Sequence, residues 1–337
     1  MEKLLLISLL ISFLATIIAM PFWIKRAKHA GLVGKDINKS SLKEVAEAGG
    51  IIVIFGFVLG VLSYVALKTF YFKSSDNLTE IFALLCTIIL ISFIGIIDDI
   101  LGWKIGLGKR VRIVLLIFAA IPLMVINAGS PGVFIPFIGS VNLGLIYALI
   151  IIPIGIVGAS STFNFLAGYN GLEASQGILL LLAVSAMSII TGSSWLGLIG
   201  LCMVFSLIAF LYYNKFPAKI FPGDVMTYSI GGLIAIMAIL GNYEFFAVFI
   251  FIPYILETVL KSRGRLKKES FGEPQKDGSI KNKYDKIYGL EHLAIRILEK
   301  IKPSKKAYEW EVVLLINFFQ LIVIALGFLL FVVWEVI

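Results

Sequence analysis

Long apolar runs separated by short polar connections make up most of the chain. Each run is long enough, as a helix, to cross the hydrocarbon core of a bilayer, which is about 30 Å thick. Ten such runs lie at about 4–24, 49–72, 80–97, 112–127, 143–160, 177–191, 195–213, 225–240, 244–260 and 311–335. The pattern predicts an all-α, polytopic integral membrane protein with about ten transmembrane helices.

The basic residues predict the orientation of these helices. Of the 29 Lys and Arg residues, all but Lys3, Lys68 and Lys73 lie in or directly beside one alternating set of connections. Basic residues in short connections stay in the cytoplasm, so this set is cytoplasmic and both termini face outside. The set comprises 25–48, 98–111, 161–176, 214–224 and 261–310.

Composition supports a single transmembrane domain over residues 1–337. The chain is 59% hydrophobic with a mean hydropathy of +0.99, which leaves no sizeable soluble domain. Its net charge of +8 is explained by the cytoplasmic connections, and no nucleic-acid partner is expected. The long basic loop 261–310 carries apolar residues at helical spacing near 286–301, which predicts an amphipathic helix on the membrane surface with His292 on its polar face.

Three polar stretches end or begin predicted helices. "IGIIDDILG" ends the third helix, "NFLAGYNGLEASQG" (164–177) follows the fifth, and "FPGD" opens the eighth. The orientation places all three on the cytoplasmic face, together with loop 261–310. A transporter, the alternative class, needs polar or broken-helix features near the midplane, whereas the helix centres here are mostly Leu, Ile, Val and Phe.

The polar stretches offer hard oxygen ligands: Asp98, Asp99, Asp224, Asn164 and Asn170. Only two histidines and two cysteines occur, which argues against zinc or a redox metal. Mg²⁺ fits, because it takes one or two protein oxygens, keeps waters and binds phosphate oxygens. Lys and Arg on the same face suit anionic phosphates. These residues indicate a membrane enzyme that acts on a phosphorylated, lipid-linked substrate.

At these motifs the chain resembles the polyprenyl-phosphate N-acetylhexosamine-1-phosphate transferases (glycosyltransferase family 4). "DD", "NFLAGYNGLE" and "FPGD" resemble the family's three cytoplasmic signatures, and "VAEAGG" (45–50) its second-helix entry. Bacterial members usually carry "DGLDG" where this chain has "NGLEA". The eukaryotic UDP-GlcNAc–dolichyl-phosphate GlcNAc-1-phosphotransferase carries "LAGxNGLEAGQ", and "YYNKFPAKIFPGD" is similar to it too. Since the last loop lacks the eukaryotic insertion, the resemblance suggests an archaeal counterpart.

The resemblance implies transfer of GlcNAc-1-phosphate from UDP-GlcNAc to dolichyl (polyprenyl) phosphate, giving lipid-PP-GlcNAc and UMP. This would be the first step of lipid-linked oligosaccharide synthesis for protein N-glycosylation. Mg²⁺, or Mn²⁺ in its place, is the implied cofactor, and a multi-pass cell-membrane protein with a cytoplasmic active site is the implied setting. Another UDP-HexNAc donor, such as UDP-GalNAc or UDP-MurNAc-pentapeptide, stays open, as does a homodimer.

The resemblance also implies residue roles in catalysis. Asn164 and Asp224 match the Mg²⁺ ligands. Asp98 and Asp99 match an acidic pair that either deprotonates the lipid phosphate or organises the metal site.

The basic residues that the resemblance singles out would bind phosphate. Lys109, with Lys104 as the second candidate, matches a phosphate-binding lysine. Arg263 and Arg265 match an Arg-x-Arg that grips pyrophosphate and sugar. His292 stands where bacterial members carry a histidine cluster and is counted with the substrate-binding residues.

Four further residues match the nucleotide pocket. Gly168 permits a close backbone approach and Asn170 offers an amide that pairs with uracil. Glu47 matches a carboxylate that faces the nucleotide. Glu173, in the same "NGLE" motif, is counted with the substrate-binding residues.

Overall fold

The structure is a computed structural model that describes residues 3–39, 43–102, 106–135 and 139–335. Within these ranges helices dominate, which confirms the predicted fold class. The short or wide helices are η1 (Lys3–Leu6), η2 (Leu67–Tyr71) and η3 (Tyr147–Ile151). The α-helices are α1 (Ile7–His29), α2 (Gly50–Ala66), α3 (Leu78–Leu101), α4 (Lys109–Ala119), α5 (Ile121–Val125), α6 (Ile152–Phe163), α7 (Leu172–Ile190), α8 (Ser194–Asn214), α9 (Asp224–Gly241), α10 (Glu244–Ile250), α11 (Ile252–Arg263), α12 (Leu290–Ile301) and α13 (Glu309–Glu335).

All ten predicted apolar runs fall on helices, but they differ in length. Seven helices of the described chain are long and apolar enough to span a membrane, and the count is eight if the α10–α11 pair, bent by 56°, forms one span. Run 143–160 falls on the shorter helix Tyr147–Phe163. Run 112–127 is divided between α4 and α5. The protein is therefore a polytopic membrane protein, and three of its ten apolar runs are shorter, divided or bent.

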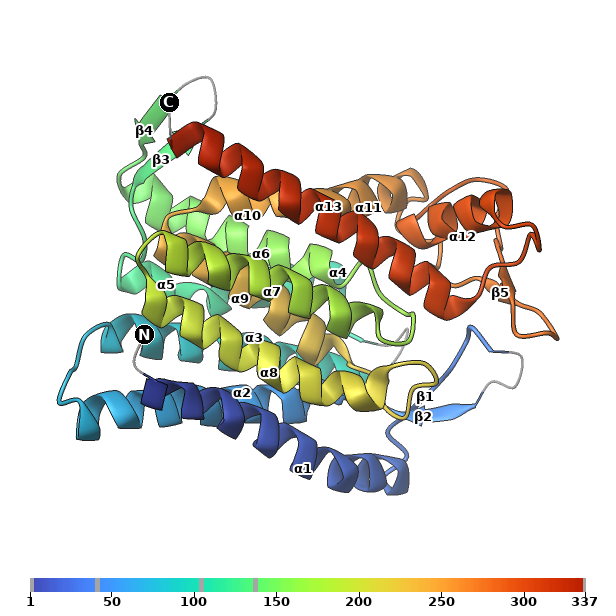
Figure 1. The fold of residues 1–337 in the computed structure, drawn as a ribbon, viewed down its shortest axis with the longest axis horizontal. Helices are drawn as coiled ribbons and strands as arrows, with labels where there is room; N and C mark the ends of the chain where they lie inside the picture. Colours follow the sequence, from blue (N-terminus) through green and yellow to red (C-terminus); the bar gives the residue numbers. More distant parts are fainter. Residues whose placement is uncertain (1–2, 40–42, 103–105, 136–138, 336–337) are drawn as a thin grey trace.

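Three two-stranded antiparallel hairpins decorate the ends of the bundle (Figure 1). Hairpin β1–β2 and hairpin β5–β6 lie with α12 at one end, and β3–β4 lies at the other end, where α1 begins and α13 ends. The end that carries β1–β2 therefore gathers the connections predicted to be cytoplasmic. The strands are β1 (Val33–Lys35), β2 (Glu44–Ala46), β3 (Gly132–Ile135), β4 (Gly139–Asn142), β5 (Glu273–Pro274) and β6 (Ile280–Lys281).

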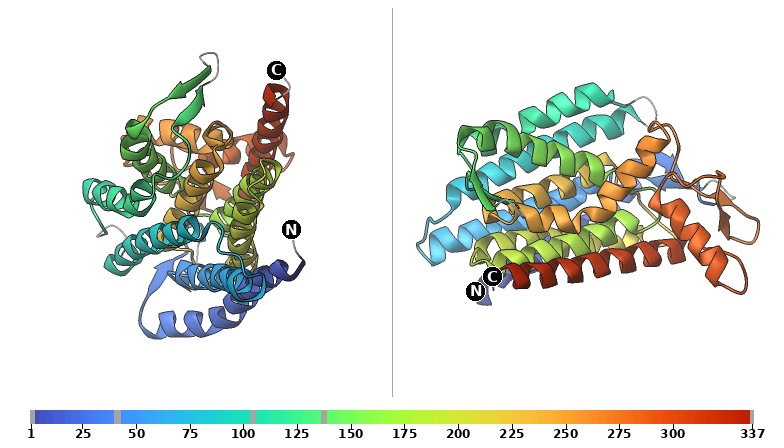
Figure 2. Two further views of the ribbon diagram at one scale, coloured as in Figure 1. Left: turned by 90° about the vertical axis from the view of Figure 1, so that its left-hand side faces the viewer. Right: turned by 90° about the horizontal axis from the view of Figure 1, so that it is seen from above.

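Helix α9 occupies the middle of the bundle (Figure 2). Of its residues, 89% are buried inside the protein. It packs mainly on α3 and α6, and small residues let the backbones approach closely. A Cβ on Gly95 of α3 would lie 2.4 Å from the Val225 Cα, and one on Gly231 would lie 2.3 Å from the Ala159 carbonyl oxygen. The close α3–α9 contact sets the acidic end of α3 beside the start of α9.

A second seam of small residues joins α1, α2 and α8. Thr16 Oγ1 and Ser206 Oγ are 2.6 Å apart, and Ser206 also donates to the Val53 carbonyl at 2.7 Å. Gly56 lies opposite these hydroxyls, and a Cβ there would come within 2.0 Å of Thr16 Oγ1 and 2.9 Å of the Ser12 carbonyl oxygen. The seam therefore depends on a bare backbone at position 56.

Replacing Gly56 with alanine should destabilise the protein by about 1–3 kcal/mol, because the new methyl group overpacks the seam. Gly158→Ala is the matched control, since a Cβ at that helical position meets no atom within 4 Å. The control should be neutral or gain up to about 1 kcal/mol from helix propensity. Thermal unfolding in detergent measures both; equal midpoints would contradict the packing argument.

Candidate active site

A cavity of about 800 Å³ opens at the end of the bundle that carries β1–β2. Its wall combines the β1 segment, the end of α3, the turn that precedes α7, the start of α9 and Phe271 of the loop after α11. The structure brings seven of the predicted site residues to this one wall. They are Glu47, Asp99, Asn164, Gly168, Asn170, Glu173 and Asp224.

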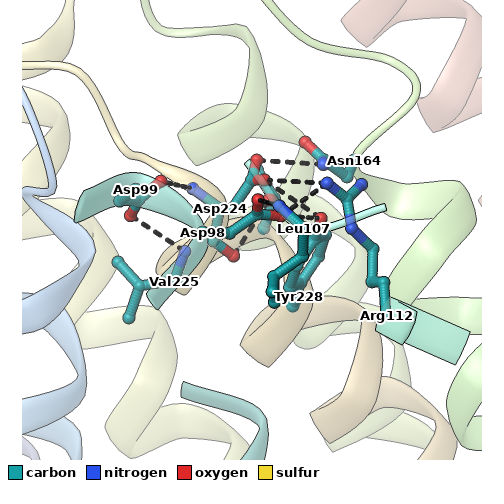
Figure 3. A network of polar contacts seen from close by, with 9 residues as sticks. Asp98, Asp99, Leu107, Arg112, Asn164, Asp224, Val225 and Tyr228 are labelled. Atoms are coloured by element: carbon teal, nitrogen blue, oxygen red, sulfur yellow. Dashed lines mark hydrogen bonds and ion pairs between the residues drawn. The ribbon is translucent and has the colours of Figure 1, made fainter. Parts of the chain in front are cut away.

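Asp98 is not among the residues that line the cavity. Protein donors occupy both of its carboxylate oxygens (Figure 3). Oδ1 accepts the Leu107 backbone N–H at 2.7 Å. Oδ2 accepts from Arg112 Nη2 at 2.5 Å and from the Tyr228 hydroxyl at 3.1 Å. Asp98 therefore holds the connection after α3, α4 and α9 together.

Asp99 caps the N-terminus of α9. Its Oδ1 accepts the Asp224 N–H at 2.7 Å and its Oδ2 accepts the Val225 N–H at 3.3 Å. A carboxylate at this position satisfies two otherwise unpaired donors and complements the helix dipole. Gly223 permits this approach, because its φ is +73° and a Cβ there would lie 2.3 Å from Asp99 Oδ2.

The Asp224 side chain is 28% exposed, compared with 3% for Asp98. Its Oδ1 accepts from Asn164 Nδ2 at 3.0 Å and its Oδ2 from the Tyr228 hydroxyl at 3.0 Å. The Arg112 guanidinium lies 3.7 Å from Oδ2. The Asp224 carboxylate thus lines the cavity, and the hydrogen bonds from Asn164 and Tyr228 fix its orientation.

The donor set of Asn164 and Asp224 fits Mg²⁺. Within the described residues, no group of three or more His, Cys, Asp or Glu side chains is arranged to hold a metal ion. Mg²⁺ commonly takes only one or two protein oxygens and completes its shell with water and phosphate oxygens. Asn164 turns its nitrogen to Asp224, and rotation of this amide offers its oxygen instead.

Arg112 is a site residue that the sequence analysis missed. It bridges Asp98 and Asp224, and its guanidinium lies 5.2 Å from the centre of the Tyr228 ring. Lys109 begins α4 with an exposed side chain, and Lys104 lies outside the described residues. Since positions three apart share a helix face, the spacing of Lys109 and Arg112 in "KRVR" was an available signal.

Glu173, in the first turn of α7, holds the turn that precedes this helix. Glu173 Oε1 accepts the Gly168 N–H at 2.8 Å. Gly168 has a φ of +104°, and a Cβ there would lie 2.7 Å from the Phe271 ring. The glycine therefore allows loop 264–289 to close against the turn. The approach of a nucleotide to Gly168, which the resemblance implies, stays a prediction.

Two residues of the segment after β1 complete this region, and the sequence analysis missed both. Asn38 Nδ2 donates to the Gly168 carbonyl at 3.0 Å, while its Oδ1 accepts the Gly272 N–H at 3.2 Å. Asp36 accepts from Asn170 Nδ2 at 3.2 Å. Both are almost fully buried. These residues join three segments that are far apart in the chain.

Glu47 stands at the cavity wall beside β2, and burial raises the pKa of its carboxyl. A Cβ on Gly34 would lie 2.1 Å from Glu47 Oε1, so the β1 glycine makes room for this side chain. The Trp23 indole N–H donates to the Glu47 carbonyl at 3.1 Å. The carboxyl is thus positioned by hairpin β1–β2 and by the end of α1.

Three predicted substrate-binding residues lie away from the cavity wall. Arg263 ends α11 and Arg265 follows it, both with exposed side chains. His292 is 1% exposed, so its side chain is covered by the protein and does not face water. Its Nδ1 accepts the Tyr288 N–H at 3.3 Å, and burial lowers its pKa to about 4. His292 is therefore neutral near pH 7.

Helix α12 packs on the bundle through buried polar groups as well as apolar ones. Glu291 is fully buried, and burial raises its pKa well above the usual range. Glu257 of α11 accepts the Leu290 N–H at 2.6 Å and lies 3.5 Å from the Lys261 ammonium. Lys261 also donates to the Phe165 carbonyl, which ties α11 to the turn at the cavity wall.

Comparison with known proteins identifies the family. The model of glycosyl transferase family 4 matches residues 81–242. A protein of Saccharolobus solfataricus, provisionally named a UDP-N-acetylglucosamine–dolichyl-phosphate N-acetylglucosaminephosphotransferase, is 38% identical over 87% of this chain and 88% of its own. The Dictyostelium discoideum enzyme of that name is 28% identical over 68% of this chain and 64% of its own. A Staphylococcus carnosus phospho-N-acetylmuramoyl-pentapeptide-transferase is 27% identical over 74% and 80%.

The matched region contains most of α3, the turn before α7 and the start of α9, which together carry Asp98, Asp99, Asn164 and Asp224. Similarity to the Saccharolobus protein extends over most of the chain. The chain belongs to glycosyl transferase family 4, whose members transfer a sugar 1-phosphate to a polyprenyl phosphate.

Proposed function

We propose that the protein transfers GlcNAc-1-phosphate from UDP-GlcNAc to dolichyl or another polyprenyl phosphate, with Mg²⁺ as cofactor. The proposal rests on one observation: seven of the predicted site residues line the same cavity. Its volume of about 800 Å³ suits a ligand as large as a sugar nucleotide. The names of the Saccharolobus and Dictyostelium relatives support the choice of sugar and lipid.

The cavity lies on the cytoplasmic side in this proposal. All five connections assigned to the cytoplasm, four by their basic residues and 161–176 by alternation, reach the end of the bundle that carries β1–β2 and α12 (Figure 1). A polyprenyl phosphate held in the membrane could present its headgroup here while its tail stays among the helices. The soluble nucleotide enters from the water side.

The chemical step is a phosphoryl transfer. An oxygen of the lipid phosphate attacks the phosphorus that carries the sugar, the bond from that phosphorus to the bridging oxygen breaks, and UMP leaves with the electron pair. Mg²⁺, held by Asn164 and Asp224, would neutralise charge on the diphosphate. Arg112, fixed by Asp98 and Tyr228, adds positive charge beside Asp224. Positioning and charge neutralisation supply the catalysis.

In this proposal Asp98 and Asp99 organise the metal site and do not deprotonate the lipid phosphate. A phosphate monoester with a second pKa of about 6 already carries the nucleophilic anion near pH 7, so it needs no base. Backbone N–H groups occupy both oxygens of Asp99, and Asp98 is committed to Arg112, Leu107 and Tyr228. These contacts support a pair that shapes the site.

A donor panel tests the proposal. Purified protein is incubated with Mg²⁺, polyprenyl phosphate and UDP-GlcNAc, UDP-GalNAc or UDP-MurNAc-pentapeptide, and both UMP and the lipid product are assayed. UDP-GlcNAc should give the highest rate and a lipid-PP-GlcNAc product. Turnover of only another donor would replace the proposed substrate, and nucleotide-independent lipid movement without UMP would favour a transporter.

A further inference from the structure

The side-chain amide of Asn170 is held in one orientation. Its Nδ2 donates to Asp36 Oδ2 at 3.2 Å, and Asp36 is 4% exposed. An ionised carboxylate has only acceptor atoms, so the atom that faces it must be the amide nitrogen. The opposite orientation would place Asn170 Oδ1 against the carboxylate and repel it. Asp36 therefore decides which way the amide points.

The partners of Asp36 and Asn170 are themselves fixed. The Lys39 ammonium pairs with Asp36 and lies 3.5 Å from Glu309 Oε2. Glu309, at the start of α13, accepts the Asn170 N–H through Oε1 at 2.8 Å. Asn170 is thus held at both its backbone and its side chain. Asp36, Asn170 and Glu309 are all at most 5% exposed, so water competes little for these bonds.

The remaining polar atom of the amide is turned to the cavity. Asn170 lines the cavity, and in the part of the chain that the structure describes no protein donor bonds its Oδ1. The amide nitrogen keeps a second hydrogen beyond the one given to Asp36. Asn170 therefore offers a ligand an acceptor of fixed position with a donor beside it.

We propose that Asp36 is a specificity-determining positioning residue that makes the cavity select uracil over cytosine through Asn170. Uracil presents an N–H at N3 next to a carbonyl oxygen, which matches Oδ1 and the free Nδ2 hydrogen. Cytosine has a lone pair at N3 and would have to shift by one ring position to offer its amino group. This inference rests on the proposed UDP-sugar substrate and names the residue that enforces the choice of base.

The test compares UMP with CMP. Binding of each to the purified full chain is measured by calorimetry for the wild type and for Asp36→Asn. We expect the wild type to prefer UMP by at least about 100-fold, because the mismatched base leaves buried polar atoms unpaired. Asparagine at position 36 offers both a donor and an acceptor, so either orientation of Asn170 becomes allowed. The UMP-to-CMP ratio should fall at least about 10-fold, equal to about 1.4 kcal/mol.

Two controls separate orientation from general damage. Asp36→Glu keeps an acceptor-only group and should retain the preference. Asn38→Ala removes the bonds to Gly168 and Gly272, so it should weaken both nucleotides alike and leave the ratio unchanged. An unchanged ratio in Asp36→Asn, with UMP still bound, would overturn the inference.

A measurement on the wild type covers the case in which Asp36→Asn does not fold. UMP methylated at N3 has no donor there and should bind at least about 100-fold more weakly than UMP. Equal binding of the two would refute the role of Asn170 Oδ1 and therefore that of Asp36. A wild type that binds neither UMP nor CMP would instead contradict the proposed function, so the two failures are distinguishable.

Discussion

Asp224→Asn should reduce UMP release by about 10³-fold while the protein stays folded, because it removes the charge that faces the reacting phosphates. The amide keeps the volume of the carboxylate, and its oxygen can still accept from Tyr228 or Asn164. Asp224 also starts α9 with its backbone N–H bonded to Asp99, a contact that the substitution leaves in place. The loss should therefore appear in turnover and Mg²⁺ dependence, with little change in thermal stability.

The matched control for this experiment is Asp76→Asn. Asp76 is an exposed carboxylate just before α3, at the opposite end of that helix from Asp99. Its substitution changes net charge by the same amount and should leave turnover within about 2-fold, as expected for a surface change away from the site. Full activity in Asp224→Asn at saturating Mg²⁺ would remove Asp224 from the proposed metal site.

Arg112→Gln is expected to lower kcat/KM by about 10²-fold or more. Without the guanidinium, the Asp98 side chain, which is 3% exposed, loses its cationic partner. The Asp98 and Asp224 carboxylates then face each other with no positive charge between them. Arg112→Lys should recover only part of the activity, because an ammonium cannot bridge two carboxylates while stacking on Tyr228. Steady-state UMP release, measured at several Mg²⁺ concentrations, gives kcat/KM for each variant and for the wild type.

Neighbouring cations on α4 provide the controls for Arg112. Arg110 is exposed, and Arg110→Gln should leave kcat/KM nearly unchanged. Lys109→Gln in the same series tests the phosphate-binding role predicted for Lys109: a rise in KM for the lipid phosphate would support that role. If Arg112→Gln matched Arg110→Gln, the bridge between Asp98 and Asp224 would have no part in catalysis.

Sequence pattern predicted much of this molecule because the membrane simplifies the problem. Apolar length alone located the helices, and the alternation of basic connections gathered the polar motifs at one end. The count of spans was less certain, since run 112–127 breaks at Ala120 and the α10–α11 run bends. Length and composition contain little information about such breaks.

Three of the missed residues share a physical cause. Asp36, Asn38 and Glu309 bond residues that are distant in sequence, and no local pattern marks them as buried. Arg112 is the exception, because its helical spacing from Lys109 was visible in the sequence. The burial of His292 was not visible for the same reason: α12 has an amphipathic pattern, but its polar residues Glu291 and His292 are covered by α11 and loop 264–289. Periodicity identifies a helix face without identifying what covers it.

The adjacent acids Asp98 and Asp99 illustrate how one motif divides its roles. Successive helix residues project about 100° apart, so the two carboxylates leave α3 on different faces. One meets Arg112 and Tyr228, and the other meets the first N–H groups of α9 (Figure 3). The motif "DD" could predict an acidic site, but only the packing of α9 on α3 distinguishes its two members.

The hydrogen bonds of Asn38 and Asn170 have a consequence for the order in which the protein folds. Asn38 bonds Gly168 and Gly272, which lie 130 and 234 residues further along the chain. Asn170 bonds Glu309, which lies 139 residues beyond it. A chain emerging from the ribosome inserts its early helices long before these partners exist. This wall of the cavity should therefore form only after the last helix has been made, so prematurely terminated chains would insert into the membrane without turnover.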